Sequence, residues 1–260
     1  MIDDDRSELL GLAFARARMA TVVAQCLAWC RSPRSSHVVI TANASHLCMM
    51  RRDEALREAT QAGDLSVADG MSVVWALRAL GRPVPERVAG VDLMTALLAA
   101  GATEGLRVYF LGARREVVDE LVARCRRRYP GLVVAGYHDG YFAAEAHRPI
   151  AEAIRACAPH MLFVGMPSPF KEIWVQRYRE TLDVPVIIGV GGSFDVIAGY
   201  IQRAPRPVQR LGLEWAWRLM MEPRKLWKRY LSTNTEFLWL VGRELVARRL
   251  AGVSATIHSD

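Results

Sequence analysis

The sequence has few cysteines and no long hydrophobic run. Because the number of cysteines is odd and no C-x-x-C spacing occurs, neither a zinc site nor a disulfide framework is predicted, and we expect a protein of the reducing cytoplasm. The cysteines are Cys26, Cys30, Cys48, Cys125 and Cys157. No stretch of about 20 uncharged apolar residues is present, so a membrane-spanning helix is not predicted. Residues 9–29 contain Arg16 and Arg18 and follow an acidic start, which favours an amphipathic first helix over a secretory signal.

An excess of positive charge is missing from most of the chain. The formal net charge of +7 comes from residues 200–250, which hold eleven Lys and Arg against four Glu, whereas the other residues hold 23 of each sign. A basic surface over the whole core is therefore not expected, and nucleic acid is not a predicted partner. The sequence also has no P-loop, no H-E-x-x-H and no nucleophile elbow, and nothing in it requires a metal or another cofactor.

What the chain does contain is a regular alternation of short apolar runs and helical patterns. Strands that alternate with helices imply parallel βαβ units, and continuous apolar strands imply that both faces of the sheet are covered. We therefore predict a Rossmann-like α/β core in residues 1–200. The predicted strands are His37–Ile40, Leu65–Ala68, Val108–Leu111, Leu132–Ala135, Met161–Val164 and Val184–Ile188.

The break at Arg203-Ala-Pro-Arg-Pro207 marks the boundary to a helical C-terminal appendage, residues 201–260. This appendage holds four of the seven tryptophans, Trp215, Trp217, Trp227 and Trp239. A basic helix with tryptophan on its apolar side is typical of a membrane interface, where each cation contributes on the order of 1 kcal/mol near an anionic leaflet. The alternative is an amphipathic helix packed on the core, with Arg stems covering apolar surface. We favour the membrane because charge and tryptophan are enriched together.

Polar side chains follow the first two predicted strands. Thr41 and Asn43 offer a hydroxyl and an amide suited to orienting a polar ligand, and Asp69-Gly70 places a carboxylate where it can take a proton from a hydroxyl. Each has a simpler explanation, since Thr and Asn are common in loops and Asp69 can cap a helix beginning near Met71. On local pattern alone, the cap is the favoured interpretation of Asp69.

Glycines follow the later strands. Gly189-Val-Gly-Gly-Ser-Phe-Asp195 lets the backbone approach a phosphate at a helix N-terminus, although the pattern is not G-x-G-x-x-G and the glycines can equally serve helix–strand packing. Lys171 and Glu172, at a predicted helix start, face the same crevice or are simply a solvated helix end. Because ligands bind outside the carboxyl ends of parallel strands, the predicted ligand-binding set from these loops is Gly112, Gly165, Gly191, Gly192 and Asp195.

Taken in order, these strings resemble the WecG/TagA/CpsF family of bacterial glycosyltransferases. The resemblance runs from about residue 37 to 232, and the ordered set is specific although each string is weak. The strings are T-x-N at Thr41, D-G at Asp69, G-x-D-L at Gly90, the stretch 129–142, G-V-G-G-x-F-D at Gly189, R-A-P at Arg203 and G-L-E-W-x-x-R-L-x-x-E-P at Gly212.

The resemblance implies an inverting enzyme that transfers a sugar from a UDP-sugar to a polyprenyl-diphosphate-linked saccharide, without a metal, at the cytoplasmic face of the inner membrane. It implies Asp69 as general base, with Thr41, Asn43 and Lys171 beside it. It also implies that the appendage closes the site and that cations reach the diphosphate. The matching cations are Arg218, with Lys225 and Lys228 or Arg229, and Arg87 and Arg224 are further predicted substrate-binding residues.

One position departs from the family pattern. Where the family usually reads P-K-Q-E, this chain reads Pro169-Phe-Lys171-Glu172, so a lysine replaces an active-site glutamine. The added cation suits a donor with a carboxylate, such as a uronic acid.

Two other classes of function stay open from the sequence: a nicotinamide-dependent oxidoreductase, against which the missing G-x-G-x-x-G counts, and a non-enzymatic membrane-binding protein built around the appendage. A homo-oligomer is possible from an apolar patch under the appendage. The sequence does not identify the donor sugar, the acceptor or the polysaccharide.

Overall fold

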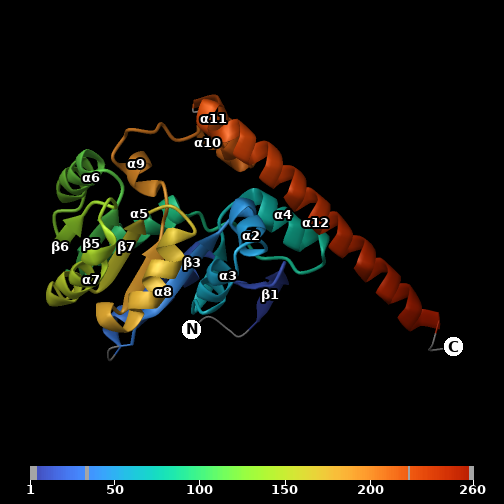
Figure 1. Cartoon of the computed structure of the whole chain (residues 1–260), viewed down its shortest axis with the longest axis horizontal. Coiled ribbons are helices and arrows are strands. Elements are labelled where there is room, and N and C mark those ends of the chain that lie inside the picture. Colours follow the sequence, from blue (N-terminus) through green and yellow to red (C-terminus); the bar gives the residue numbers. More distant parts are fainter. Residues whose placement is uncertain (1–4, 33–34, 222, 258–260) are drawn as a thin grey trace.

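A parallel six-stranded sheet forms the centre of the computed structural model, which describes residues 5–32, 35–221 and 223–257 (Figure 1). The strand order is β4-β3-β8-β7-β5-β6, and every neighbouring pair is parallel. The strands are β3 (His37–Ala42), β4 (Leu65–Ala68), β5 (Arg107–Gly112), β6 (Val133–His138), β7 (Met161–Gly165) and β8 (Val186–Gly189). This confirms the predicted Rossmann-like α/β core.

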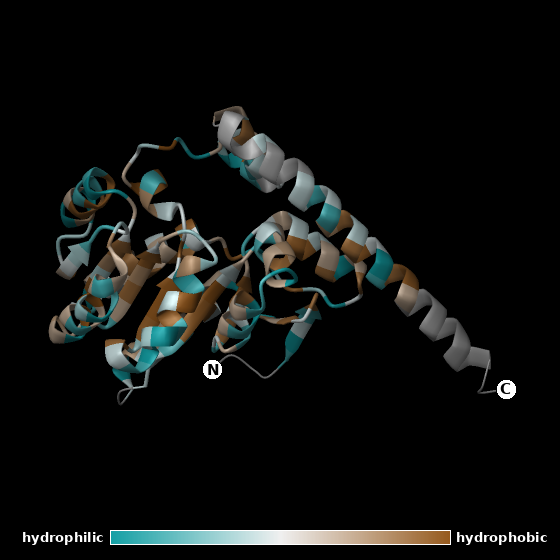
Figure 2. Cartoon of the chain, viewed as in Figure 1, coloured by the Kyte–Doolittle hydropathy of each residue, from teal (hydrophilic) through white to brown (hydrophobic). Residues whose placement is uncertain are grey.

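Successive residues of the strands alternate between two apolar cores. Val38 and Ile40 of β3 face one core, and Val39 between them faces the other. The first core is covered by α2 (Ala44–Met50), α3 (Glu54–Gln61), α4 (Met71–Ala79), α7 (His147–Ala156) and α8 (Phe170–Leu182). The second is covered by α1 (Met19–Arg31), α5 (Gly90–Thr103), α6 (Arg115–Arg128) and α9 (Ser193–Ile197). Figure 2 shows the apolar strands enclosed between helices with hydrophilic outer faces, as the continuous apolar runs predict.

The beginning of the chain differs from the prediction of one amphipathic helix over residues 9–29. Residues Arg6–Leu9 (β1) and Leu12–Ala15 (β2) form an antiparallel hairpin, and the helix begins only at Met19. The turn between the strands uses positive φ at Leu10 and Gly11, and the alternating burial of β1 buries Ser7 and Leu9. A period of two over so few residues is easily hidden in a helical pattern.

Two predicted helices are each divided in the structure. The helical pattern from Ser45 to Ala62 is broken at Arg51–Asp53, where the Asp53 side chain accepts a hydrogen bond from the Leu56 N–H and begins α3. The predicted helix Gln209–Met221 is divided at Gly212, where φ is +68°. A Cβ on Gly212 would lie 2.7 Å from Met71 Cβ and 2.8 Å from the Trp75 ring, so the chain passes directly over α4 at this point.

The appendage consists of α10 (Arg206–Arg210), α11 (Glu214–Met221) and α12 (Pro223–Ile257). In Figure 1, α12 passes α2 and then continues away from the sheet. Where it crosses α2 it buries Phe237, Leu240 and Val241 in the first core, and the Arg52 guanidinium contacts Glu236. The middle of α12 is therefore packed as part of the core, which is the arrangement that the alternative interpretation of the appendage describes. Within the described residues, no helix combines the length and apolar character needed to cross a membrane.

Candidate active site

The predicted site residues lie along one edge of the sheet. Asp69 follows β4, Thr41 and Asn43 end β3, Gly189 ends β8, Gly165 ends β7 and Gly112 ends β5, and these strands are neighbours in that order. Parallel strands bring their carboxyl ends to the same edge, so residues distant in sequence form one row.

Asp69 is held between the loops that follow β3 and β4. Its backbone N–H donates to the Ala42 carbonyl at 2.9 Å, and its carboxylate accepts a hydrogen bond from the Gly90 N–H at the start of α5. A Cβ on Gly90 would lie 3.5 Å from both Asp69 Oδ2 and Thr41 Oγ1, so glycine leaves room for both polar groups. Asp69 does not cap α4, where Gly70 occupies the cap position without a side-chain bond.

Burial raises the pKa of the Asp69 carboxyl above its ordinary value. The Gly90 N–H and the Arg87 guanidinium lower this pKa, whereas the charges of Glu214 and Asp92 raise it. A partly buried carboxylate with a raised pKa is a stronger base than a solvated one, which is the property a proton acceptor in catalysis needs.

Thr41 and Asn43 are each anchored by one hydrogen bond. The Thr41 hydroxyl donates to the Gly189 carbonyl at 2.7 Å, which joins β3 to β8. The Asn43 side-chain oxygen accepts the His46 N–H at 3.0 Å and begins α2. Asn43 is exposed, so its amide NH₂ is directed to a ligand or to solvent.

Arg87 belongs to a cluster of four ionic side chains that joins the core to α11. Its guanidinium contacts Glu214 and lies 3.5 Å from Asp92. Arg203 binds Asp92 through two hydrogen bonds of 2.7 Å and lies 3.4 Å from Glu214. Because two positive charges face two negative ones, the cluster is neutral. Arg87 is close enough to Asp69 for its charge to lower the pKa of that carboxyl. The same charge is already paired with Glu214 within the protein.

A cavity of about 350 Å³ lies between the core and α10, lined by Met71, Arg87, Arg206 and Gln209. Met71 begins α4 directly after Asp69-Gly70, so this cavity adjoins the loop that carries the carboxylate. Its polar lining consists of one amide and two guanidinium groups, of which that of Arg87 is already paired with Glu214. Such donors suit an anionic ligand.

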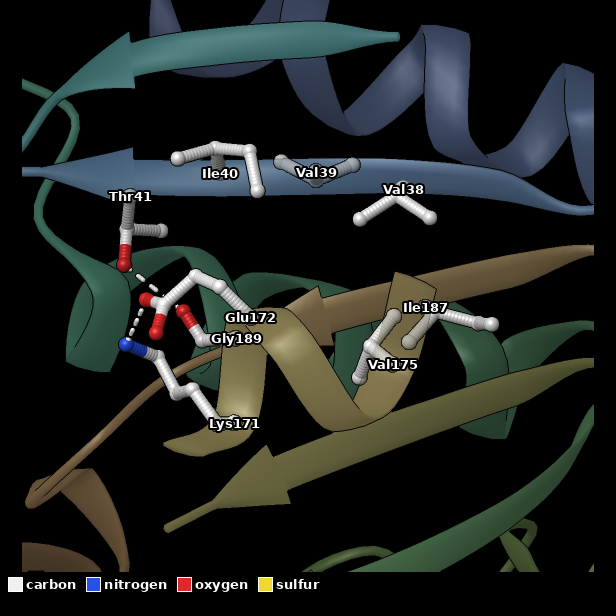
Figure 3. A pocket seen from close by; sticks show the side chains of 9 residues that line it. All are labelled: Val38, Val39, Ile40, Thr41, Lys171, Glu172, Val175, Ile187 and Gly189. Carbon is white, nitrogen blue, oxygen red and sulfur yellow. Dashed lines mark hydrogen bonds and ion pairs between the residues drawn. The ribbon is translucent and has the colours of Figure 1, made fainter. Parts of the chain in front are cut away.

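Lys171 and Glu172 line a second, much smaller cavity of about 10 Å³ together with Thr41 and Gly189 (Figure 3). Both side chains are buried, and the Lys171 ammonium contacts Glu172 and Ser168. Lys171 is therefore not a solvated helix end. Its charge is compensated by Glu172, so the hypothesis of an acidic donor requires a donor carboxylate to take the place of Glu172.

The predicted glycines differ in their surroundings. A Cβ on Gly112 would lie 2.5 Å from the Gly165 carbonyl carbon, and one on Gly165 would lie 2.6 Å from the Phe194 ring. These two glycines therefore allow close packing of strands and α9. Gly191, with φ of +50° and open space beside it, and the exposed Gly192 lead into α9, which carries the partly buried Asp195. They stay the candidates for phosphate approach.

The appendage cations lie on α11 and α12, but the side chains of residues 210, 218, 224–226, 228–231 and 248–257 are outside the described part of the structure. The side chains of Arg218, Arg224, Lys225, Lys228 and Arg229 are among these, so their predicted roles stay predictions. The described side chains around them are strongly apolar and exposed. Those with exposed fractions of 40% or more are Leu211, Leu213, Trp215, Met220, Met221 and Trp227.

No group of three or more His, Cys, Asp or Glu suited to a metal ion occurs in the part of the chain that the structure describes. Four cysteines are buried and Cys157 is partly buried, all as free thiols. Burial raises the pKa of Cys26 and of Cys125 to about 12, so both stay protonated and pack as small apolar residues.

Several residues of this site were not predicted from the sequence. Gly90, Asp92 and Glu214 occur in the quoted strings, but their contact with Asp69 and Arg87 depends on helices that meet only in the fold. His46 shows no signal in sequence, because a histidine inside a helix is indistinguishable from a surface one until its neighbours are known.

The chain is similar in sequence to known proteins. The family model described as "Glycosyl transferase WecG/TagA/CpsF family" matches residues 7–251. The chain is 36% identical over 194 residues to an N-acetylglucosaminyldiphosphoundecaprenol N-acetyl-beta-D-mannosaminyltransferase of Bacillus spizizenii, covering 75% of this chain and 74% of that protein. It is 33% identical over 195 residues to the protein of the same name from Bacillus subtilis, covering 75% of each.

Proposed function

The chain belongs to the WecG/TagA/CpsF family of glycosyltransferases, and on that basis we propose that it is an inverting enzyme that transfers a sugar from a UDP-sugar to a polyprenyl-diphosphate-linked saccharide. The acceptor class follows the names of the two Bacillus relatives, which act on N-acetylglucosaminyldiphosphoundecaprenol. Such a reaction belongs to the assembly of cell-envelope polysaccharides. The observation that carries the proposal is the partly buried Asp69 carboxylate at the sheet edge, beside Thr41, Asn43 and a cavity with a cationic lining.

Asp69 acts as the general base in this mechanism. An acceptor hydroxyl is a poor nucleophile near neutral pH, so a carboxylate removes its proton as the new bond forms. The hydroxyl oxygen attacks the anomeric carbon from the face opposite to UDP, the bond to UDP breaks, and the configuration inverts. Thr41 and Asn43 orient the reacting sugars, the latter through its outward amide NH₂.

UDP departs with growing negative charge. In a site that excludes water, fixed hydrogen-bond donors and cations of the protein have to stabilise this charge. Backbone N–H groups of the Gly191–Gly192 loop lie at the adjacent strand end. Arg87 and Arg206 line the larger cavity. We assign these groups, together with the cations of α11 and α12, to the diphosphates of donor and acceptor, and no metal ion is required by this assignment.

The appendage is proposed to contact the cytoplasmic face of the inner membrane, where a lipid-linked acceptor lies. Large apolar side chains are exposed on α10 to α12, among them Leu211 (64%) and Met220 (68%), and they are interspersed with cations. Sedimentation with phosphatidylglycerol vesicles tests this assignment. Binding should weaken in a Leu211→Ser, Met220→Ser double variant. It should not weaken in Val133→Ser, which changes an exposed apolar residue at the start of β6, outside the appendage. Equal binding by all three proteins would contradict it.

The direct test of the activity is transfer from a panel of UDP-sugars to a lipid-linked acceptor of the type the relatives use, with NADH binding measured by calorimetry as the alternative. Transfer that disappears in Asp69→Asn supports the proposal. NADH binding without any UDP binding would favour the oxidoreductase instead. The same vesicle binding without pocket-dependent transfer would favour a non-enzymatic membrane protein.

A further inference from the structure

Glu172 lies at the centre of a buried polar network that joins α8 to α2. Its Oε1 atom accepts the Ser168 hydroxyl at 2.8 Å and contacts the Lys171 ammonium. The same oxygen lies 3.4 Å from Nδ1 of His46. The side chains of Glu172, Lys171 and His46 are 3%, 8% and 3% exposed, so these contacts are shielded from water. Oε2 of Glu172 has no hydrogen-bond partner among the described residues.

His46 connects this network to the candidate active site. Its Nε2 atom lies 3.0 Å from the Thr60 hydroxyl, which is fully buried. Burial lowers the pKa of His46 to about 4, so the ring is neutral at physiological pH. Thr60 then donates to Nε2, and Nδ1–H faces Glu172. The backbone N–H of the same residue holds the Asn43 side chain, so the orientation of Asn43 and the position of Glu172 depend on one residue.

Lys171 connects the network to the end of β8. A Cβ on Gly189 would lie 2.9 Å from Lys171 Cε, so glycine at this position lets the lysine stem pass. Thr41 donates to the carbonyl of the same Gly189. Figure 3 shows Thr41, Lys171, Glu172 and Gly189 converging at this point. The network therefore touches the loops that carry both Thr41 and Asn43.

We propose that Glu172 is a positioning residue, which through His46 and Lys171 holds Asn43 and Thr41 in place beside Asp69, with Lys171 as its counter-ion. This inference rests on the proposed transfer reaction. It does not make Glu172 a proton donor or acceptor in the reaction. A buried ion pair of this kind can often be replaced by apolar residues without loss of stability, so we assign the pair to the geometry of the site and not to the stability of the fold.

The test compares four variants for thermal stability, donor KM and kcat. Glu172→Gln should lower kcat at least tenfold while donor KM changes less than threefold. Lys171→Met should lower the melting temperature because it leaves a carboxylate buried without its counter-ion. The double variant Lys171→Met, Glu172→Met should recover the melting temperature but not kcat. The matched control Glu180→Gln, the same change at an exposed position of α8, should keep both.

Wild-type kcat in Glu172→Gln, or recovery of kcat together with stability in the double variant, would overturn the positioning role. Asp69→Asn and wild type are measured in the same assay. No transfer by wild type contradicts the proposed function itself. Transfer that is lost in Asp69→Asn but kept in Glu172→Gln contradicts only the role of Glu172.

Discussion

Acidification should destabilise the fold through one buried histidine, His46. The side chain is 3% exposed, and desolvation lowers its pKa from 6.5 to about 4, although Glu172 acts in the opposite direction. Well above pH 6.5 the ring is neutral in the folded and unfolded states and contributes no pH dependence. Between the two pKa values the unfolded chain binds the proton and the folded protein does not, so stability falls as the pH falls.

The size of this effect follows from the two pKa values. A difference of about 2.5 pKa units corresponds to about 3 kcal/mol, and about 2.5 kcal/mol of this is already lost at pH 4.5. For a domain whose total stability is about 5–15 kcal/mol, such a loss is easily measured. His46→Gln removes the titration, keeps a polar group near Thr60 and Glu172, and so isolates the contribution of the ring.

The assay is urea unfolding followed by tryptophan fluorescence at pH 7.5 and pH 4.5, for wild type and His46→Gln. Carboxylates elsewhere titrate in both proteins and cancel in the comparison. The free-energy difference between the two proteins should shift by about 2.5 kcal/mol in favour of the variant at pH 4.5. A difference that is the same at both pH values would refute the reasoning, since it would mean that His46 titrates alike in folded and unfolded chains.

Three further predictions concern the proposed base, its electrostatic neighbours and the packing of the appendage. Asp69→Asn should lower turnover at least ~10²-fold with UDP-sugar binding kept, as measured by steady-state kinetics and calorimetry; near-normal turnover would remove Asp69 as base. Because the charge of Glu214 raises the pKa of Asp69 and that of Arg87 lowers it, the acid limb of the pH–rate profile should move to lower pH in Glu214→Gln and to higher pH in Arg87→Met. Shifts in the same direction would exclude this coupling. Phe237→Ala should destabilise the whole fold by about 3–5 kcal/mol in urea unfolding, because Phe237 is buried in the first core; a loss below about 1 kcal/mol would mean that α12 is not part of that core.

The sheet and its helices follow from sequence pattern because they depend on local features. Continuous apolar runs at Val108 or Ile187 are typical of strands covered on both faces, and the structure places them so. The sequence does not predict the hairpin Arg6–Ala15, because its period of two extends over only four residues in each strand. The break between α2 and α3 is not predicted either, because it depends on one hydrogen bond from the Leu56 N–H to the Asp53 side chain. Residue preference alone does not distinguish an Asp that caps a helix from an Asp within one.

The sequence predicts which loops lie side by side at the candidate site, but it does not predict which side chains contact one another there. That Asp69, Thr41 and Gly189 follow neighbouring strands can be inferred from the rule for parallel sheets. The partners of each group depend on crossings between distant elements. Lys171 illustrates the difference: its sequence position suggests an added cation facing the crevice, whereas the fold brings Glu172 and Ser168 within reach of its ammonium and buries all but 8% of its side chain.

The electrostatics of Asp69 link this proposed base to the placement of the appendage. Glu214 lies on α11 and pairs with Arg87, the same guanidinium that lowers the pKa of Asp69. If α11 moved away, Asp69 would lose a negative neighbour and Arg87 would lose a counter-ion, and both changes would lower the pKa of Asp69 and weaken it as a base. A docked α11 therefore favours the stronger base. Burial of Asp69, which is the largest cause of its raised pKa, acts in the same direction, so base strength and closure over the site rise together.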